Sequence, residues 1–387
     1  MKVAVVYHFF PHYRAAVLRE LLASPNHEYV LVADERPTDP TVKTWTVEDR
    51  CSFISAPCRR LFGPFLLQRG LLGLGLRRDL DAIIYLGSPY FICTWISAFI
   101  ARMRGKRVLF WTHGWTRSER GLKSWLRTIF YRLAHGLLLY GNQAREAGLA
   151  RGFTSEQLYV IYNSLDYEAH KLLRTQITPE HLQLLKQSQF SAPELPLVIC
   201  AARLTHRSRF DLLIEAQARL AHEGHRINVL LIGDGPEKGR LEFQAQQLGV
   251  PVRFLGACYD EKTLAAWTVA AHLTVSPGKV GLTAIHSLAY GTPVITHSDA
   301  EDQGPEWESI EPGISGDFFL KDDADDLKRV IRKWTSRPAL SGLARENCRQ
   351  IIEHYYNPTY QRMAIERALG GEHFKHPVEQ PLDSLAA

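Results

Sequence analysis

Residues 276–295 read SPGKVGLTAIHSLAYGTPVI, and this stretch decides how the chain folds. It passes from the end of an apolar strand through a loop with two glycines into a helix. Gly-Thr-Pro then ends the helix, and a second apolar strand follows. Parallel strands joined through helices are the repeating unit of open α/β sheets. The stretch therefore predicts one strand–helix–strand unit of a doubly wound domain.

The same alternation of short apolar runs and helix-length segments extends in both directions. The strand candidates are KVAVVYH, YVLVAD, SFISA, AIIYLG, RVLFWTH, GLLLYG and YVIYN in the first half, then LVICAAR, INVLLIGDG, VRFLGA, LTVSPG, PVITH and DFFL. Continuous Val, Ile and Leu runs are typical of parallel strands that are covered on both faces. Two such series predict an α/β protein with two Rossmann-like doubly wound domains that face each other across a cleft, with ligands at the carboxyl ends of the strands.

The polar stretch between residues 163 and 196 marks the boundary. We expect an N-terminal domain over residues 1–180 and a C-terminal domain over residues 190–355. A helix at about 355–370, set off by Pro358, should pack back on the first domain, and residues 371–387 should form a loose tail.

Composition favours a globular cytoplasmic protein, with 45% apolar and 22% charged residues among 387. The six cysteines are scattered without a CxxC pair, which indicates neither a disulfide framework nor a zinc site. The first ten residues resemble a strand and not a signal peptide. Residues 83–101 carry no charge, but Gly87, Ser88 and Pro89 interrupt them, so a strand, a turn and a buried helix are favoured over a membrane span.

Charge is distributed unevenly between the two halves. Residues 1–180 hold 24 Lys and Arg against 15 Asp and Glu, and the remainder holds 22 against 26. Two stretches concentrate the excess: residues 58–78 (CRRLFGPFLLQRGLLGLGLRR) and residues 102–132, which include Trp115 and Trp125. Arginines beside apolar side chains suit an element that lies on an anionic membrane surface. Packing of the apolar run on the core, with the arginines as a solvated rim, explains the pattern equally well.

The glycine loop of residues 276–295 is the best candidate for an anion site. Gly278 and Gly281 let the backbone bend, and the amides of Val280, Gly281 and Leu282 would lie at a helix N-terminus, where N–H groups and the helix dipole attract a diphosphate. Lys279 would add a charge. His286 lies further along the helix, where a ligand contact and a buried core histidine are equally supported.

Two further loops follow strands of the same series. GDGPEKGRLE supplies Gly233 and Gly235, which permit a tight turn and close approach of a ligand to backbone amides. CAARLTHRSRFD supplies Arg203 at a strand end and Arg207 and Arg209 in the next loop, and guanidinium groups bind phosphate oxygens bidentately. Solvated loop charge explains Arg207 and Arg209 at least as well as a ligand contact.

The order of GDGP, FLG, a glycine loop, a helix and G-T-P-V resembles the retaining GT-B glycosyltransferases of family four. The upstream A-R-L matches the family's G-R-L, and YNSLD at residues 162–166 matches its P-N-G-V-D. The resemblance covers nearly the whole chain and is most convincing over residues 198–320. It implies transfer of a sugar from a nucleotide-diphosphate sugar to an acceptor, with retention at the anomeric carbon, in cell-surface polysaccharide or lipopolysaccharide biosynthesis.

The resemblance also implies residue roles. The nucleotide base would pack near Leu255 and Gly256, Arg203 would meet the phosphates, and His113 in WTHG would reach the transferred sugar. The family's lysine after G-R-L is replaced here by Ser208. Its paired glutamates are replaced by Gly278 and His286, and Glu306 matches a later P-E position near the site.

These departures leave two readings open. The chain is either a divergent enzyme, or a degenerate GT-B protein that binds a nucleotide sugar or a partner enzyme without turnover; a sugar-nucleotide epimerase is a more distant alternative. We expect a saccharide or lipid-linked saccharide acceptor, no nucleic-acid partner, no cofactor and no metal, because no DxD follows a strand. We also expect a cytoplasmic location, peripheral at the inner face of the membrane.

Overall fold

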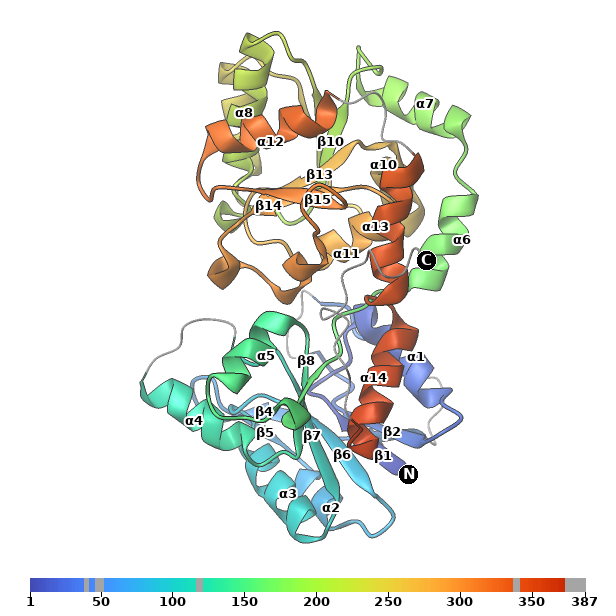
Figure 1. Ribbon diagram of the computed structural model, residues 1–387, viewed down its shortest axis with the longest axis vertical. Helices are drawn as coiled ribbons and strands as arrows, with labels where there is room; N and C mark the ends of the chain where they lie inside the picture. The colour runs from blue at the N-terminus through green and yellow to red at the C-terminus, as the bar shows by residue number, and fades with distance from the viewer. Residues whose placement is uncertain (38–41, 46–51, 116–120, 337–341, 373–387) are drawn as a thin grey trace. The chain divides into compact units, whose positions relative to one another are not determined.

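The computed structural model describes residues 1–37, 42–45, 52–115, 121–336 and 342–372. It divides into two compact units (Figure 1). Unit 1 contains Met1–Tyr162 and the chain from Pro358 onward, and unit 2 contains Asn163–Asn357. The expected pair of doubly wound α/β domains is confirmed.

Unit 1 is built on a seven-stranded sheet in the order β3-β2-β1-β6-β7-β8-β9. Its pairings are parallel throughout, with β1 beside both β2 and β6. The strands are β1 (Lys2–Val6), β2 (Glu28–Ala33), β3 (Phe53–Ser55), β6 (Ala82–Leu86), β7 (Arg107–Thr112), β8 (Gly136–Leu139) and β9 (Leu158–Val160). Their Val, Ile and Leu side chains are buried on both faces, as parallel sheets require.

Helices cover both faces of this sheet. They are α1 (Ala15–Leu22), α2 (Leu71–Leu76), α3 (Ile92–Met103), α4 (Leu122–Tyr131), α5 (Asn142–Leu149) and α14 (Pro358–Gly370). One buried cluster includes residues of α1 and α14, and the other includes residues of α2, α3, α4 and α5. A separate antiparallel pair, β4 (Cys58–Arg60) with β5 (Leu66–Gln68), precedes α2.

The final described helix belongs to unit 1 although it follows unit 2 in the chain. Ile365 and Leu369 of α14 are buried in the same cluster as α1, and the Arg107 guanidinium donates to the carbonyl of Ala368 at 2.8 Å. α13 (Gly342–His354) ends just before Pro358, where α14 begins, because proline is tolerated in the first turn of a helix but not in its interior. The tail expected over residues 371–387 lies almost wholly outside the described residues.

Unit 2 is built on a six-stranded parallel sheet in the order β12-β11-β10-β13-β14-β15. The strands are β10 (Leu197–Ala201), β11 (Asn228–Ile232), β12 (Val252–Gly256), β13 (Leu273–Ser276), β14 (Val294–His297) and β15 (Gly316–Phe319). Its helices are α6 (Tyr167–Thr175), α7 (Pro179–Gln189), α8 (Phe210–His222), α9 (Lys238–Gln247), α10 (Glu261–Ala270), α11 (Leu282–Ala289), α12 (Ala324–Thr335) and α13. Asp260 and Asp323 cap α10 and α12 through their side chains.

The boundary between the units differs from the one expected. Residues 163–180 were assigned to the first domain, but they belong to unit 2. The reason is that α6 packs on α10 and α11, and the Arg174 guanidinium donates to the carbonyl of Ala289 at 2.7 Å. The polarity of this stretch marked a linker in the sequence, but the exposed outer face of α6 accounts for it.

The uncharged stretch over residues 83–101 forms most of β6, a turn and most of α3. None of the helices in the described ranges combines the length and apolar character that a membrane crossing requires.

Candidate functional site

The candidate site lies where the strand order of unit 2 reverses. β10 is central, with β11 and β12 on one side and β13, β14 and β15 on the other. In doubly wound sheets, ligands bind outside the carboxyl ends of the strands at this switch point. The loops that leave β10 and β13 therefore frame the candidate site, and they contain Arg203 and the glycine loop, respectively.

The loop after β10 presents two exposed arginines. Arg203 and Arg207 are both exposed, and across the described ranges neither forms an ion pair. The Ser208 hydroxyl donates to the carbonyl of Arg203 at 2.7 Å. Ser208, which occupies the family's lysine position, therefore stabilises the loop that carries Arg203.

Arg209 has different partners. It has a left-handed backbone conformation with φ 50°, and its guanidinium pairs with Asp211 at 3.2 Å and with Asp322. Two carboxylates thus neutralise it, so Arg209 is less suited than Arg203 or Arg207 to bind phosphate.

Gly233 and Gly235 allow two loops to pack closely against each other. A Cβ on Gly233 would lie 2.0 Å from the carbonyl oxygen of Ala202, and one on Gly235 would lie 2.2 Å from that of Leu204. The sequence indicated that these glycines allow a ligand to approach, but the structure shows that they allow the β10 loop to approach. The Gly233 amide also donates to the carbonyl of Gly256 at 2.8 Å, next to partly buried Leu255.

The glycine loop after β13 packs directly against the β10 loop. The Gly278 amide donates to the carbonyl of Ser208 at 3.1 Å. A Cβ on Gly278 would lie 2.0 Å from the carbonyl oxygen of Arg207. A glutamate at position 278, as the family has it, would therefore require this loop to move.

One of the three amides expected to face a phosphate is already occupied. The Val280 amide donates to Gln303 Oε1 at 2.8 Å, while Gln303 Nε2 donates to Thr296 Oγ1 at 2.9 Å and to the carbonyl of His297 at 3.1 Å. Gln303 is 4% exposed, so this amide is enclosed. The prediction that the Val280 amide faces the ligand is therefore wrong, because Gln303 occupies it.

The next two amides remain available. α11 begins at Leu282 with Gly281 as its N-cap, and no side chain caps it. Over the part of the chain that the structure describes, neither the Gly281 nor the Leu282 amide donates a hydrogen bond. Unsatisfied N–H groups at a helix N-terminus favour an anion.

The side chains of Lys279 and Glu306 both lie close to Gly304. A Cβ on Gly304 would lie 2.8 Å from Glu306 Oε2 and 3.5 Å from Lys279 Cε. Glu306 is buried, and its Oε1 accepts from Asn163 Nδ2 at 2.9 Å. Lys279 is exposed, so it is free to reach a ligand beside the glycine loop.

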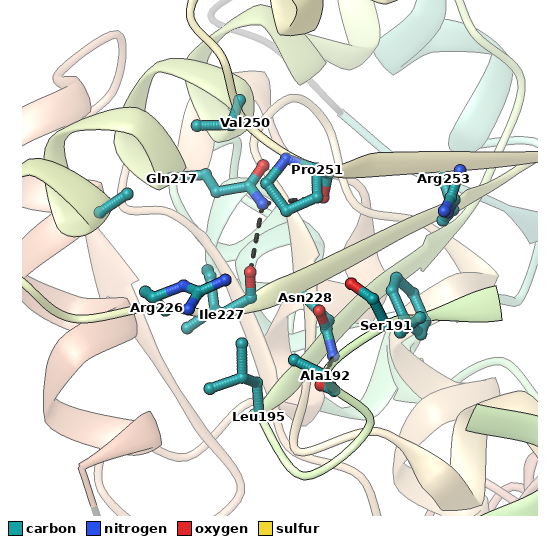
Figure 2. Close-up of a pocket in the computed structure, with 12 residues that line it drawn as sticks. Ser191, Ala192, Leu195, Gln217, Arg226, Ile227, Asn228, Val250, Pro251 and Arg253 are labelled. Carbon is teal, nitrogen blue, oxygen red and sulfur yellow. Dashed lines mark hydrogen bonds between the residues drawn. The ribbon is translucent and has the colours of Figure 1, made fainter. Parts of the chain in front are cut away.

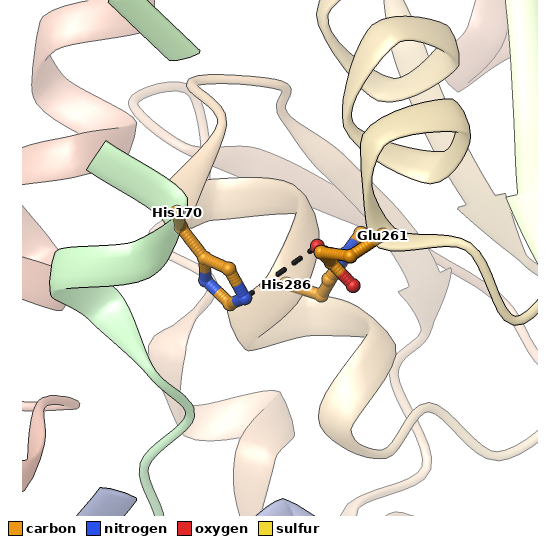
Figure 3. A group of neighbouring side chains, drawn as sticks. All are labelled: His170, Glu261 and His286. Atoms are coloured by element: carbon orange, nitrogen blue, oxygen red, sulfur yellow. Dashed lines mark hydrogen bonds and ion pairs between the residues drawn. The ribbon is translucent and has the colours of Figure 1, made fainter. Parts of the chain in front are cut away.

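His286 belongs to a polar cluster between three helices. Its Nε2 lies 2.9 Å from Glu261 Oε1, which also accepts from the Tyr290 hydroxyl at 2.7 Å. His170 of α6 completes the cluster (Figure 3). Burial raises the pKa of Glu261, but hydrogen bonds from His286 and Tyr290 reverse that effect and lower it overall.

His113 lies in unit 1, directly after β7, and its side chain is exposed. Its ring contacts the ring of Tyr140, with centroids 4.6 Å apart. The Thr112 hydroxyl accepts from the Gly114 amide at 3.1 Å and contacts the Gly87 carbonyl at 2.9 Å. These contacts fix the loop from which His113 projects.

Sequence reasoning missed several polar residues, and Arg14 is the most unusual. It is 7% exposed, and its guanidinium carbon lies 5.0 to 5.2 Å from the rings of Tyr7, Trp111 and Tyr140. A cation over aromatic faces is stabilised by their quadrupoles. Arg14 and His113 thus contact the same tyrosine, Tyr140. A lone arginine after a Pro-His-Tyr sequence carries no periodic signal that could have revealed this.

The cavity found in unit 2 lies away from these loops. It has a volume of about 50 Å³ and lies near Ser191, Asn228 and Pro251, at the amino ends of the strands (Figure 2). Gln217 donates from one wall to the carbonyl of Ile227 at 3.2 Å. This small cavity is at the wrong end of a parallel sheet for a substrate.

Part of the chain is similar to known proteins. Residues 183–355 match the family described as Glycosyl transferases group 1. The chain is 31% identical over 112 residues to the GDP-mannose-dependent alpha-(1-6)-phosphatidylinositol dimannoside mannosyltransferase of Mycobacterium tuberculosis. That alignment covers 28% of this chain and 29% of the relative. It is 32% identical over 142 residues to the lipopolysaccharide core biosynthesis glycosyltransferase LpsE of Rhizobium meliloti, over 36% of this chain and 39% of that protein. The alignments therefore span well under half of each relative.

Solved structures extend the likeness over the whole fold. Anabaena HepE in complex with UDP superposes with a TM-score of 0.71 at 17% identity, covering 96% of this chain and all of that one. The lipopolysaccharide outer core galactosyltransferase WaaB superposes with a TM-score of 0.67 at 14% identity, over 96% of this chain and 99% of that one. The fold is GT-B, and the part of the chain that matches the family model lies in unit 2.

Proposed function

We propose that this chain is a glycosyltransferase that moves a sugar from a nucleotide-diphosphate sugar to a saccharide or lipid-linked saccharide acceptor, with retention at the anomeric carbon. The observation that carries the proposal is the arrangement at the switch point of unit 2. Exposed Arg203 lies on the β10 loop, the β13 loop packs against that loop, and the amides of Gly281 and Leu282 open α11 without partners in the described chain.

This arrangement suits a leaving diphosphate. As the bond between sugar and phosphate breaks, negative charge develops on the phosphate oxygens. A guanidinium and preorganised N–H groups stabilise such charge without reorganising. Cations and amides would thus do at this site what a metal ion does in other nucleotide-sugar enzymes, and the transfer step is proposed to need neither metal nor cofactor.

The remaining roles follow from position. Arg207 and Lys279 are exposed near the same loops and would contact phosphate oxygens, and His113 would contact the transferred sugar. The nucleotide base would lie near Leu255 and Gly256. Relatives that act in lipopolysaccharide core synthesis and on phosphatidylinositol dimannoside support a place in cell-surface polysaccharide or lipopolysaccharide biosynthesis.

A donor screen tests this proposal. The purified chain would be heated with UDP-, GDP- and ADP-sugars, and the true donor should raise Tm because it binds only the folded state. Turnover of that donor with an acceptor extract, followed by the anomeric configuration of the product by NMR, then tests transfer and retention. Donor binding without turnover would support the degenerate alternative, and absence of binding by any donor would overturn the proposal.

We further propose that unit 1 lies on an anionic membrane surface on the cytoplasmic side. Residues 58–78 form the strand pair β4–β5 and the short helix α2. Leu71 and Leu74 pack into the core, whereas Phe62, in the turn between β4 and β5, is 65% exposed. All five arginines of this stretch are exposed.

The neighbouring helices continue this surface. α2 packs against α3, and Trp95 of α3 contacts Phe130 of α4. On α3, Ile96, Phe99 and Met103 form an outward row, with Met103 73% exposed, and Leu122 of α4 is 76% exposed. Exposed apolar rows beside arginines complement a lipid surface with anionic headgroups. Residues 116–120 of the second basic stretch lie outside the described residues.

A further inference from the structure

We propose that His170, Glu261 and His286 form a site for a divalent transition-metal ion, of which Zn²⁺ is the representative, that joins α6, α10 and α11 within unit 2. This site goes beyond the proposed transfer reaction and does not depend on it. The sequence predicted no metal because no DxD follows a strand. The three residues of this cluster are far apart in the chain, and the folding of unit 2 brings them together (Figure 3).

The positions of the ligand atoms fit a small ion. His286 Nε2 lies 2.9 Å and His170 Nε2 lies 3.6 Å from Glu261 Oε1, and the ligand atoms of all three residues lie within 4.8 Å of one another. Zinc binds imidazole nitrogen and carboxylate oxygen at about 2.0–2.2 Å, so ligand atoms of one tetrahedral ion are separated by about 3.4 Å. Small rotations of the side chains would bring all three within reach of one ion.

His170 is the most enclosed residue of the cluster, at 6% exposure. Its Nε2 lies on the side of Glu261 but is too far from the carboxylate for a hydrogen bond. An ion held between His286 and Glu261 would give this nitrogen a partner.

The donor atoms of the cluster indicate which kind of ion it would bind. Two imidazoles and a carboxylate are a donor set that suits zinc and neighbouring transition metals better than Ca²⁺ or Mg²⁺.

A second contact orients the carboxylate. The Tyr290 hydroxyl donates to Glu261 Oε1 at 2.7 Å, which fixes the carboxylate relative to α11. Such contacts behind a ligand commonly tune metal affinity. The Glu261 side chain is 41% exposed, so an ion has a route to the site, and a water can occupy the fourth position.

The test uses the full chain after removal of any affinity tag and dialysis against a chelator. Zn²⁺ titrated into this protein without nucleotide sugar should bind at one ion per chain by calorimetry and raise Tm. Co²⁺ at the same site should give the visible absorption of a coordinated ion. His170→Ala and Glu261→Gln should each weaken Zn²⁺ binding about 100-fold or more, since even residues behind the ligands cost 10- to 100-fold.

Matched variants keep the experiment decisive. His181→Ala removes an exposed histidine of α7 in the same unit and should leave Zn²⁺ affinity unchanged. Tyr290→Phe should weaken it by roughly 10-fold. Glu261→Gln preserves shape, so a normal circular dichroism spectrum with lost Zn²⁺ binding would support the site. Equal Zn²⁺ affinity in the wild type and in the His170→Ala and Glu261→Gln variants, or no binding by the wild type, would overturn the proposal whatever the donor screen shows.

Discussion

The side-chain oxygen of Gln303 accepts a hydrogen bond from the backbone N–H of Val280 at 2.8 Å. Because Gln303 also donates to Thr296 and to the carbonyl of His297, one buried side chain ties the glycine loop to the end of β14. The loop conformation that leaves the Gly281 and Leu282 amides available thus depends on a residue outside the loop.

Replacing Gln303 by Ala should therefore affect both stability and binding. The substitution leaves the Val280 N–H without its partner, which costs about 1–3 kcal/mol of the free energy of unfolding. The freed loop should also bind donor more weakly. Urea unfolding and donor calorimetry measure the two effects, and unchanged values for both would show that water replaces the glutamine without consequence.

Arg203→Ala tests the phosphate contact. Loss of a hydrogen bond to a charged group costs about 1.5–3 kcal/mol, so we expect donor Kd to rise roughly 10- to 150-fold with little change in Tm, since Arg203 is exposed. Arg226→Ala is the control, because Arg226 borders the small cavity at the opposite end of the sheet. Equal donor affinity in both variants would remove Arg203 from the site.

His113→Ala addresses the chemical step. If His113 contacts the transferred sugar, kcat should fall by at least tenfold while donor Kd, measured directly, changes much less. His27→Ala, at the amino end of the sheet beside Met1, should leave kcat unchanged. A rise in donor Kd that matches the whole fall in kcat/KM would mean that His113 only binds the donor.

Gly278→Ala tests the packing of the two loops. The new Cβ would meet the backbone carbonyl of Arg207 at 2.0 Å, and backbone cannot rotate away as a side chain can. Overpacking of this kind costs about 1–3 kcal/mol, so Tm should fall. The same substitution at Gly239 of α9 meets no atom within 4 Å and should stabilise the helix slightly. Equal Tm values for the two variants would contradict the close approach.

The periodic parts of the fold could be predicted from the sequence, and the site only in part. Apolar strands and the glycine loop carry local signals, so β10, β13 and α11 were found with their loops. Arg203 and Lys279 could be placed near the candidate site because each follows the carboxyl end of a predicted strand. These features depend on residues that are close together in the chain.

The partners of those residues could not be predicted. Gln303, Glu261 and His170 come from separate elements and fit no periodic pattern, because each side chain acquires its role only when helices and loops pack. The same holds for the boundary. Residues 163–180 resemble a polar linker in the sequence, yet Arg174 bonds the carbonyl of Ala289 and the His170 ring packs against Tyr290, so α6 belongs to unit 2. Contacts between distant segments decide both cases.

The last prediction concerns the basic and apolar surface of unit 1. Purified protein should sediment with vesicles that contain anionic lipid at low salt, should be released at high salt, and should not sediment with neutral vesicles. Each basic residue near an anionic leaflet contributes about 1 kcal/mol, a contribution that salt screens. Arg59, Arg60 and Arg78 are exposed, and none is ion-paired within the described ranges.

Replacing these three arginines by Gln should therefore weaken vesicle binding by about 3 kcal/mol, or roughly 100-fold. Replacing Arg226 and Arg240 of unit 2 should have little effect, because unit 2 is not proposed to face the lipid. Changing exposed Phe62 and Met103 to Ser should also weaken binding at low salt, since burial of their apolar surface adds to the electrostatic attraction. Failure of the wild-type chain to sediment with anionic vesicles at low salt would refute membrane docking and indicate that the acceptor is reached in solution.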